Sequence, residues 1–165
     1  MVKLLGSIFI LSGGFLARWA QAAERRRERD TLSDLLTALR RMAEEIRMAR
    51  TPMPDLLERL SRDCGPDAAA FFRAVADAAR QDGELSEAWD AAAKPLPLAD
   101  GDKADFQALG KDLRGDEENV CKAISLVIYN LAKSAEEQDR RRPQEDRRAT
   151  ALCFSAAALL VILLI

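Results

Sequence analysis

The chain has 165 residues, 48% of them hydrophobic and 32% charged, with a formal net charge of −2. This length leaves room for one small domain between two apolar end segments. The absence of histidine excludes Ser-His and Cys-His nucleophile systems and histidine-ligated metals. Cys64, Cys121 and Cys153 form no C-x-x-C pair, so we interpret them as small apolar packing residues. No P-loop or nucleophile elbow is found. We therefore predict no enzymatic activity, catalytic residue, cofactor, metal or small-molecule substrate.

Apolar segments with arginine-rich inner flanks stand at both ends of the chain. Residues 1–17 carry a single charge, and residues 149–165 carry none. Seventeen helical residues span about 25 Å, against a hydrocarbon core near 30 Å, and snorkelling charged side chains would make up the difference. We predict transmembrane helices within 1–23 and 149–165, contacting membrane lipid, with both termini outside. The predicted membrane-interface residues are Lys3, Arg18, Trp19, Arg25, Arg26, Arg147 and Arg148.

A cleavable signal peptide is the alternative for the first segment. Ala20, Gln21 and Ala22 have the small-x-small form of a cleavage site after an apolar run. The arginines at 25–29 favour an anchor instead, because basic residues close to an apolar segment tend to remain in the cytoplasm.

The residues between the end segments, 24–142, are predicted to form a cytosolic bundle of about six helices. In the first helix, apolar residues from Leu32 to Ala49 recur at three- and four-residue intervals. Thr51 is predicted to cap a second helix and Pro52 to occupy its first turn. That helix carries three leucines and ends near Cys64 and Gly65: Leu56, Leu57 and Leu60.

Proline and glycine separate the next helices. Pro66 opens a third helix, for which Gly83 is a plausible C-cap, and a fourth helix ends at the prolines that follow Lys94. We expect the least ordered loop between residues 94 and 101. The expected apolar positions of the third and fourth helices are Ala69, Phe72, Val75, Ala76, Ala79, Leu85, Ala88, Trp89 and Ala92.

A fifth helix is predicted to end near Gly115, and Asp116 is predicted to cap the sixth. Pro143 predicts a kink in the path to the second apolar segment, or a linker over 143–148. The fold class is therefore all-α. The apolar residues expected to be buried in these two helices are Phe106, Leu109, Leu113, Val120, Ile124, Val127, Ile128, Leu131 and Ala135.

The middle third of the chain is acidic: residues 63–119 hold six basic and fourteen acidic side chains. Such a surface would suit a basic protein partner, and a solvated face kept soluble by carboxylates is the alternative reading. Nucleic acid is not expected as a partner, because the chain has no basic patch away from the predicted membrane segments. The candidate docking residues are Asp100, Asp102, Asp105, Asp112, Asp116 and Glu117.

Several short motifs follow one another between the two apolar ends. The motif residues are Arg50, Thr51, Pro52 and Met53; Phe71 and Phe72; Gly83, Glu84, Leu85, Ser86, Glu87, Ala88 and Trp89; Leu109, Gly110, Lys111, Asp112 and Leu113; and Asp116. Their order and spacing resemble the stage III sporulation protein AB family of endospore-forming Firmicutes. Two departures from the family pattern are Arg114, where a glycine is expected, and a last apolar segment without glycine. We interpret Pro52, Gly83 and Gly115 as helix punctuation and Leu85, Ala88 and Trp89 as core.

The resemblance implies a mother-cell membrane protein of the channel between mother cell and forespore. It also implies a cytosolic bundle similar to the platform proteins of type II secretion and type IV pilus systems. By analogy, the chain would dock a secretion-type ATPase, stage III sporulation protein AA, to the other channel subunits. A membrane-tethered regulatory bundle that recruits another soluble factor is the alternative function.

Overall fold

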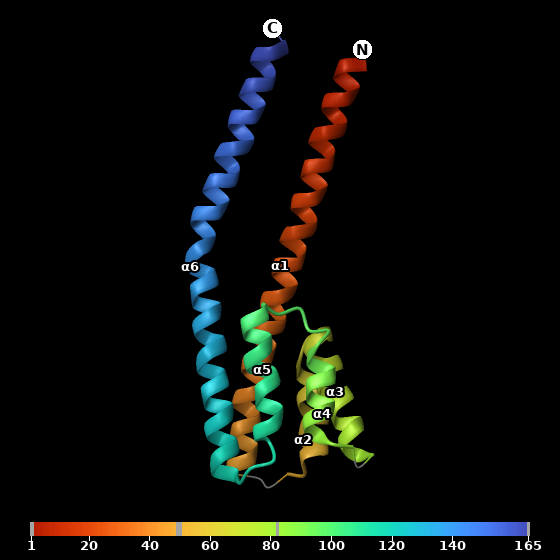
Figure 1. Ribbon diagram of the computed structural model, residues 1–165, viewed down its shortest axis with the longest axis vertical. Helices are drawn as coiled ribbons and strands as arrows, with labels where there is room; N and C mark the ends of the chain where they lie inside the picture. Colours follow the sequence, from red (N-terminus) through yellow and green to blue (C-terminus); the bar gives the residue numbers. More distant parts are fainter. Residues whose placement is uncertain (1, 49–50, 82, 165) are drawn as a thin grey trace. The chain divides into compact units, whose positions relative to one another are not determined.

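The described part of the chain is entirely α-helical apart from short connections (Figure 1). In the computed structural model, the backbone is described for residues 2–48, 51–81 and 83–164, and side chains for residues 20–48, 51–81 and 83–140. No strand occurs within these ranges, as the sequence predicted. The six helices are α1 (Val2–Met48), α2 (Met53–Asp63), α3 (Pro66–Arg80), α4 (Leu85–Ala93), α5 (Asp100–Asp112) and α6 (Glu117–Leu164).

The first and last helices are much longer than the other four. The chain divides into two units, residues 1–131 and 132–165, and the division falls within α6. Helix α6 passes through Pro143, so the linker predicted at 143–148 does not interrupt it. A proline inside a helix can kink it without ending it. The predicted boundaries at 23, 142 and 148 remain predictions.

No helix among the described side chains contains a stretch long and apolar enough to cross a membrane. The predicted spans fall almost entirely outside those side chains. So do five of the predicted membrane-interface residues: Lys3, Arg18, Trp19, Arg147 and Arg148.

An aromatic cluster joins α3, α4 and α5. The ring of Phe71 lies 4.8 Å from that of Trp89 and 5.0 Å from that of Phe106, centroid to centroid, in edge-to-face contacts. Trp89 is fully buried, and its indole Nε1 donates a hydrogen bond of 2.8 Å to the backbone oxygen of Phe106. The prediction that Trp89 is a core residue is confirmed, whereas Leu85 and Ala88 are only partly buried.

Gly110 allows α5 to approach α4 closely. A Cβ atom at this position would stand 2.7 to 2.8 Å from three atoms of Trp89, closer than real Cβ contacts. Leu109 beside it is fully buried. The Leu109-Gly110 pair is therefore a packing requirement of the bundle, in which a leucine fills the core and a glycine admits the indole.

Helix α1 is held against the start of α3 by polar contacts as well as by apolar packing. Arg27 donates two hydrogen bonds of 2.6 Å to the two carboxylate oxygens of Asp67, and Thr31 donates a third at 3.4 Å. The backbone amide of Gly65 donates to Asp34 at 2.8 Å. The hydrogen bonds from Arg27 hold the pKa of Asp67 below its usual value.

Helix α6 packs against both α1 and α5. The thiol of Cys121 lies 4.0 Å from the backbone oxygen of Ala43 in α1, and Asn130 donates to Asp105 of α5 at 2.9 Å. In the described core, α1 and α6 contribute fully or nearly fully buried apolar side chains: Leu32, Leu35, Ala38, Leu39, Met42, Val120, Ile124, Val127 and Leu131.

Three local predictions need correction. The N-cap of α2 is Pro52, and the hydroxyl of Thr51 donates instead to Glu45 at 3.2 Å. The C-cap of α3 is Gln81; Gly83 follows it and donates its amide to the Ala78 oxygen at 3.0 Å.

The third correction concerns the connection between α4 and α5. It was expected to be the least ordered loop, but Leu96 and Leu98 in it are 3% and 8% exposed. Two buried leucines anchor this segment to the core, because leaving them in water would forfeit the free energy of apolar burial. Helix α5 also begins at Asp100, within the predicted loop.

Replacing Gly110 with alanine should lower the free energy of unfolding by about 1–3 kcal/mol, because overpacking displaces the buried indole. Gly101→Ala in the same helix is the matched control, since a Cβ atom there meets nothing within 4 Å. That control should be neutral or stabilise by up to ~1 kcal/mol, as alanine favours helix. Thermal unfolding of the detergent-solubilised full chain, followed by circular dichroism, measures both. Equal stabilities for the two variants would contradict the packing role.

Replacing Asp67 with asparagine should lower the melting temperature at neutral pH and flatten its acid dependence. The folded pKa of Asp67 is depressed, so its stabilisation is present above the unfolded value near 3.8 and is lost as pH falls through the lower folded value. Melting curves at pH 7 and between pH 2 and 4.5 test this. Asp77→Asn is the control, since that carboxylate is 60% exposed and 3.7 Å from Arg80. The same pH profile for both variants would disprove the contribution of Asp67.

Candidate docking surfaces

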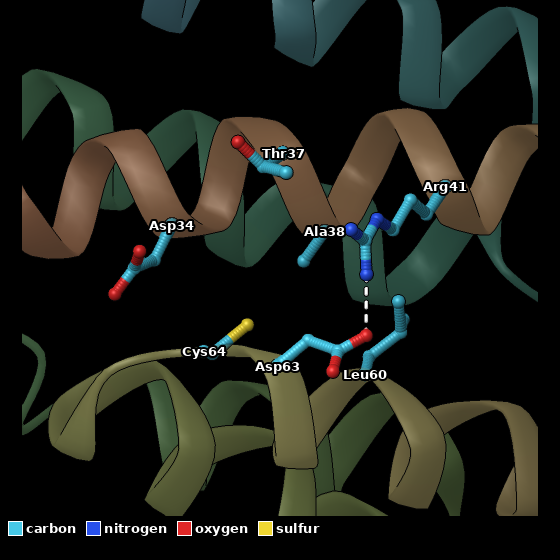
Figure 2. A pocket seen from close by; sticks show the side chains of 7 residues that line it. All are labelled: Asp34, Thr37, Ala38, Arg41, Leu60, Asp63 and Cys64. Atoms are coloured by element: carbon cyan, nitrogen blue, oxygen red, sulfur yellow. Dashed lines mark hydrogen bonds and ion pairs between the residues drawn. The ribbon is translucent and has the colours of Figure 1, made fainter.

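A small pocket lies between α1 and the end of α2 (Figure 2). Its volume is about 60 Å³, well below the several hundred Å³ of typical ligand sites. An ion pair between Arg41 and Asp63 crosses it, and Asp34 is engaged by the Gly65 amide. The polar groups that line the pocket are therefore engaged in holding α1 against the end of α2. The pocket is lined by Asp34, Thr37, Ala38, Arg41, Leu60, Asp63 and Cys64.

The cysteine in this pocket is poorly suited to nucleophilic chemistry. Burial raises the pKa of Cys64 to about 11, with a further contribution from the charge of Asp34. At neutral pH the side chain is therefore a thiol rather than the reactive thiolate. Cys121 is buried in the α1–α6 contact, and Cys153 lies outside the described side chains.

The described residues also contain no group of three or more histidine, cysteine or carboxylate side chains placed to hold a metal ion.

The six acidic residues predicted to dock a partner do not share one surface. Asp102 is only 6% exposed, and Asp105 accepts a hydrogen bond from Asn130. Asp100 is exposed at the first turn of α5. The other three lie at the opposite end of that helix, about 18 Å away for a helix of 13 residues. This second group, the acidic turn, consists of Asp112, Asp116 and Glu117, which are all exposed.

The acidic turn connects α5 to α6. Asp116 precedes α6, and its carboxylate accepts a hydrogen bond of 3.2 Å from the side-chain amide of Asn119. Among the described residues, Asp112 and Glu117 have no ion-pair partner. Arg114 lies between them but pairs with Glu84 at 2.6 Å, so its charge is directed toward the start of α4. The turn thus presents three exposed carboxylates that form no ion pair with another described residue.

This turn lies at the end of the bundle that is remote from Arg25 and Arg26 of α1. The contact between Ala43 and Cys121 places the last residues of α1 beside the first residues of α6 (Figure 1). Arg25 and Arg26 are exposed near the other end of the described part of α1. At 1.5 Å per residue, roughly 30 Å of helix separates these arginines from the end of α1 at Met48.

An exposed apolar pair on α6 was not identified from the sequence. Leu126 is 61% exposed and Tyr129 66% exposed, one turn apart. The predicted buried stripe of α6, from Val120 to Ala135, lies on the other side of the helix. Leu126 and Tyr129, two large residues outside that helical stripe, were the sequence signal that could have predicted this exposed pair. We call Lys122, Leu126 and Tyr129 the α6 ridge.

Comparison with known proteins identifies the family of the chain. The family model described as "Stage III sporulation protein AB (spore_III_AB)" matches residues 3–165. A solved structure of a stage III sporulation protein AB superimposes with a TM-score of 0.66 at 19% identity, covering 71% of this chain and 97% of that one. At this identity the structural likeness establishes the fold. No curated protein gives a significant sequence match. The chain belongs to the stage III sporulation protein AB family.

Proposed function

We propose that this sporulation protein is a non-enzymatic membrane platform that docks a cytosolic secretion-type ATPase to the channel between mother cell and forespore. The observation that carries this proposal is the exposed acidic turn, Asp112, Asp116 and Glu117, at the bundle end remote from Arg25 and Arg26. Membership of a sporulation family supports the biological setting. The arrangement would turn three exposed carboxylates toward the cytosol.

The membrane part of the proposal rests on the two ends of the chain. Their apolar segments and arginine flanks favour two spans with the bundle inside the cell, since basic flanks remain cytoplasmic. Arg25 and Arg26 are exposed, and they would meet anionic headgroups at the bilayer surface. We therefore place the protein in the mother-cell membrane with both termini outside.

The docking part rests on charge. A carboxylate surface attracts a basic partner, speeds its diffusional encounter and disfavours acidic surfaces. Of the six acidic residues predicted from the sequence, the acidic turn supplies three that are exposed and mutually close. Buried Asp102 and hydrogen-bonded Asp105 are better explained as structural. We propose that the turn binds a basic face of stage III sporulation protein AA, which would bring the ATPase to the channel subunits.

Neutralising the acidic turn should weaken capture of the ATPase. The variant Asp112→Asn, Asp116→Asn, Glu117→Gln should reduce ATPase retained on membranes about tenfold, or ~1.4 kcal/mol. The reduction should shrink at high salt, which screens exposed charges. A matched control, Asp77→Asn, Glu87→Gln, Asp100→Asn, changes the net charge equally elsewhere and should stay within about twofold. Equal losses would show a net-charge effect only, and no capture by the unaltered protein would favour the regulatory function instead.

The topology makes a separate prediction. Alkaline phosphatase fused after Ile165 should be active, because it folds only outside the cytoplasm, whereas a fusion after Asp139 in the described part of α6 should be inactive. Measuring enzyme activity against fusion abundance in intact cells tests this. Activity confined to the Asp139 fusion would invert the orientation and remove the basis for a cytosolic ATPase contact.

A further inference from the structure

The α6 ridge faces away from the core of the bundle. Ile124 and Leu131 of α6 are fully buried. At 100° per residue, Lys122 and Leu126 each lie about 160° around the helix from Ile124, and Tyr129 lies about 140° away. The ridge is thus on the side of α6 that faces away from the core. Without a partner, its leucine and tyrosine are exposed to solvent.

These two side chains are unusual for this surface. The described residues have three exposed large apolar side chains; the third, Met48, is at the end of α1. Tyr129 is also the single tyrosine of the chain. Tyrosine buries a large rigid area at small entropic cost and is enriched in protein interfaces.

We propose that the α6 ridge is a contact between two copies of this chain, packed about a twofold axis that runs parallel to α6. In this arrangement Leu126 and Tyr129 meet the same residues of the second copy, since a twofold interface is self-complementary. The inference rests on the membrane anchoring in the proposed function. Two copies in one bilayer must project in the same direction, which a parallel α6 pair allows and an antiparallel pair does not.

The charges beside the ridge fit a second copy. Lys122 pairs within its own helix with Glu118, nitrogen to oxygen 2.6 Å, and both side chains are exposed. In a parallel pair, each Lys122 also comes within reach of the second copy's Glu118, as flanking charges do in coiled coils. Repulsion between the two lysines is offset by these crossed pairs. A foreign partner with an acidic or a basic surface would instead repel one member of the Lys122–Glu118 pair.

The size of the ridge predicts where this contact forms. Two side chains and one ion pair on each copy bury far less than the roughly 1,200 Å² of a stable interface between soluble proteins. Anchoring in a bilayer confines both copies and raises their effective concentration. The contact should therefore form between copies held in one membrane.

Cysteine cross-linking of the full chain tests the proposal. In a background with Cys64, Cys121 and Cys153 replaced by alanine, Leu126→Cys or Tyr129→Cys is introduced, with Arg73→Cys on the exposed surface of α3 as the control. The proteins are reconstituted in phosphatidylethanolamine–phosphatidylglycerol vesicles at about one chain per thousand lipids and oxidised with copper phenanthroline. We expect at least about fivefold more disulfide-linked dimer at 126 or 129 than at 73. Equal yields at 73 and 129, or no dimer at either ridge position, would overturn the contact.

Charge reversal adds a readout that depends on the geometry of the pair. With Tyr129→Cys as reporter, Lys122→Glu should lower the dimer yield, and adding Glu118→Lys should restore it because the crossed pairs re-form. No difference among these variants would also overturn the arrangement. Since the vesicles contain no ATPase, failure here leaves the docking function standing. Dimer formation without ATPase capture in cells would support the contact between copies and contradict the docking function.

Discussion

The packing of Trp89 against Gly110 determines how the short helices of this bundle fit together. The indole is completely buried, its Nε1 hydrogen is bound by the Phe106 oxygen, and two of its neighbours are phenylalanine rings from α3 and α5. A buried indole needs both a partner for its N–H group and close packing on its faces. Both come from α5, one from a backbone oxygen and the other from the absence of a side chain. The position of α5 is therefore set by a residue of α4.

The surface features follow from that placement. Helix α5 ends in the acidic turn, and Arg114 in the turn pairs with Glu84 at the start of α4. Helix α6 then returns along α5 and α1, where Asn130 contacts Asp105. Once α5 is in place, its contacts position residues 117–131 of α6 and determine the side that they present to solvent. The acidic turn and the α6 ridge are consequences of core packing.

The sequence predicted most helix boundaries because proline, glycine and apolar spacing act locally. The all-α class, the start of α3 at Pro66 and the end of α2 at Cys64 depend on such signals. The failures involve contacts distant in sequence or competing local bonds. From the sequence alone, Asp102 is expected to be a surface carboxylate, Leu96 to be part of a loop and Thr51 to be a helix cap. Burial of the first two and the bond from Thr51 to Glu45 emerge only when the helices assemble. The α6 ridge was not predicted because Leu126 and Tyr129 lie outside the apolar helical period that marks the buried side.

Helix α1 links Arg25 and Arg26 to the core without a joint. It is one helix from Val2 to Met48, and it is clamped where Arg27 meets Asp67 at the start of α3. A clamp at that point opposes rotation of α1 about its own axis, because turning it would break two hydrogen bonds that share one carboxylate. Side-chain packing of Leu32 to Met42 below the clamp gives the same constraint over several turns. A rigid connection of this kind suits a protein whose contribution is to hold surfaces at fixed positions. The acidic turn and the Arg25 end of α1 are thus connected through packed helices.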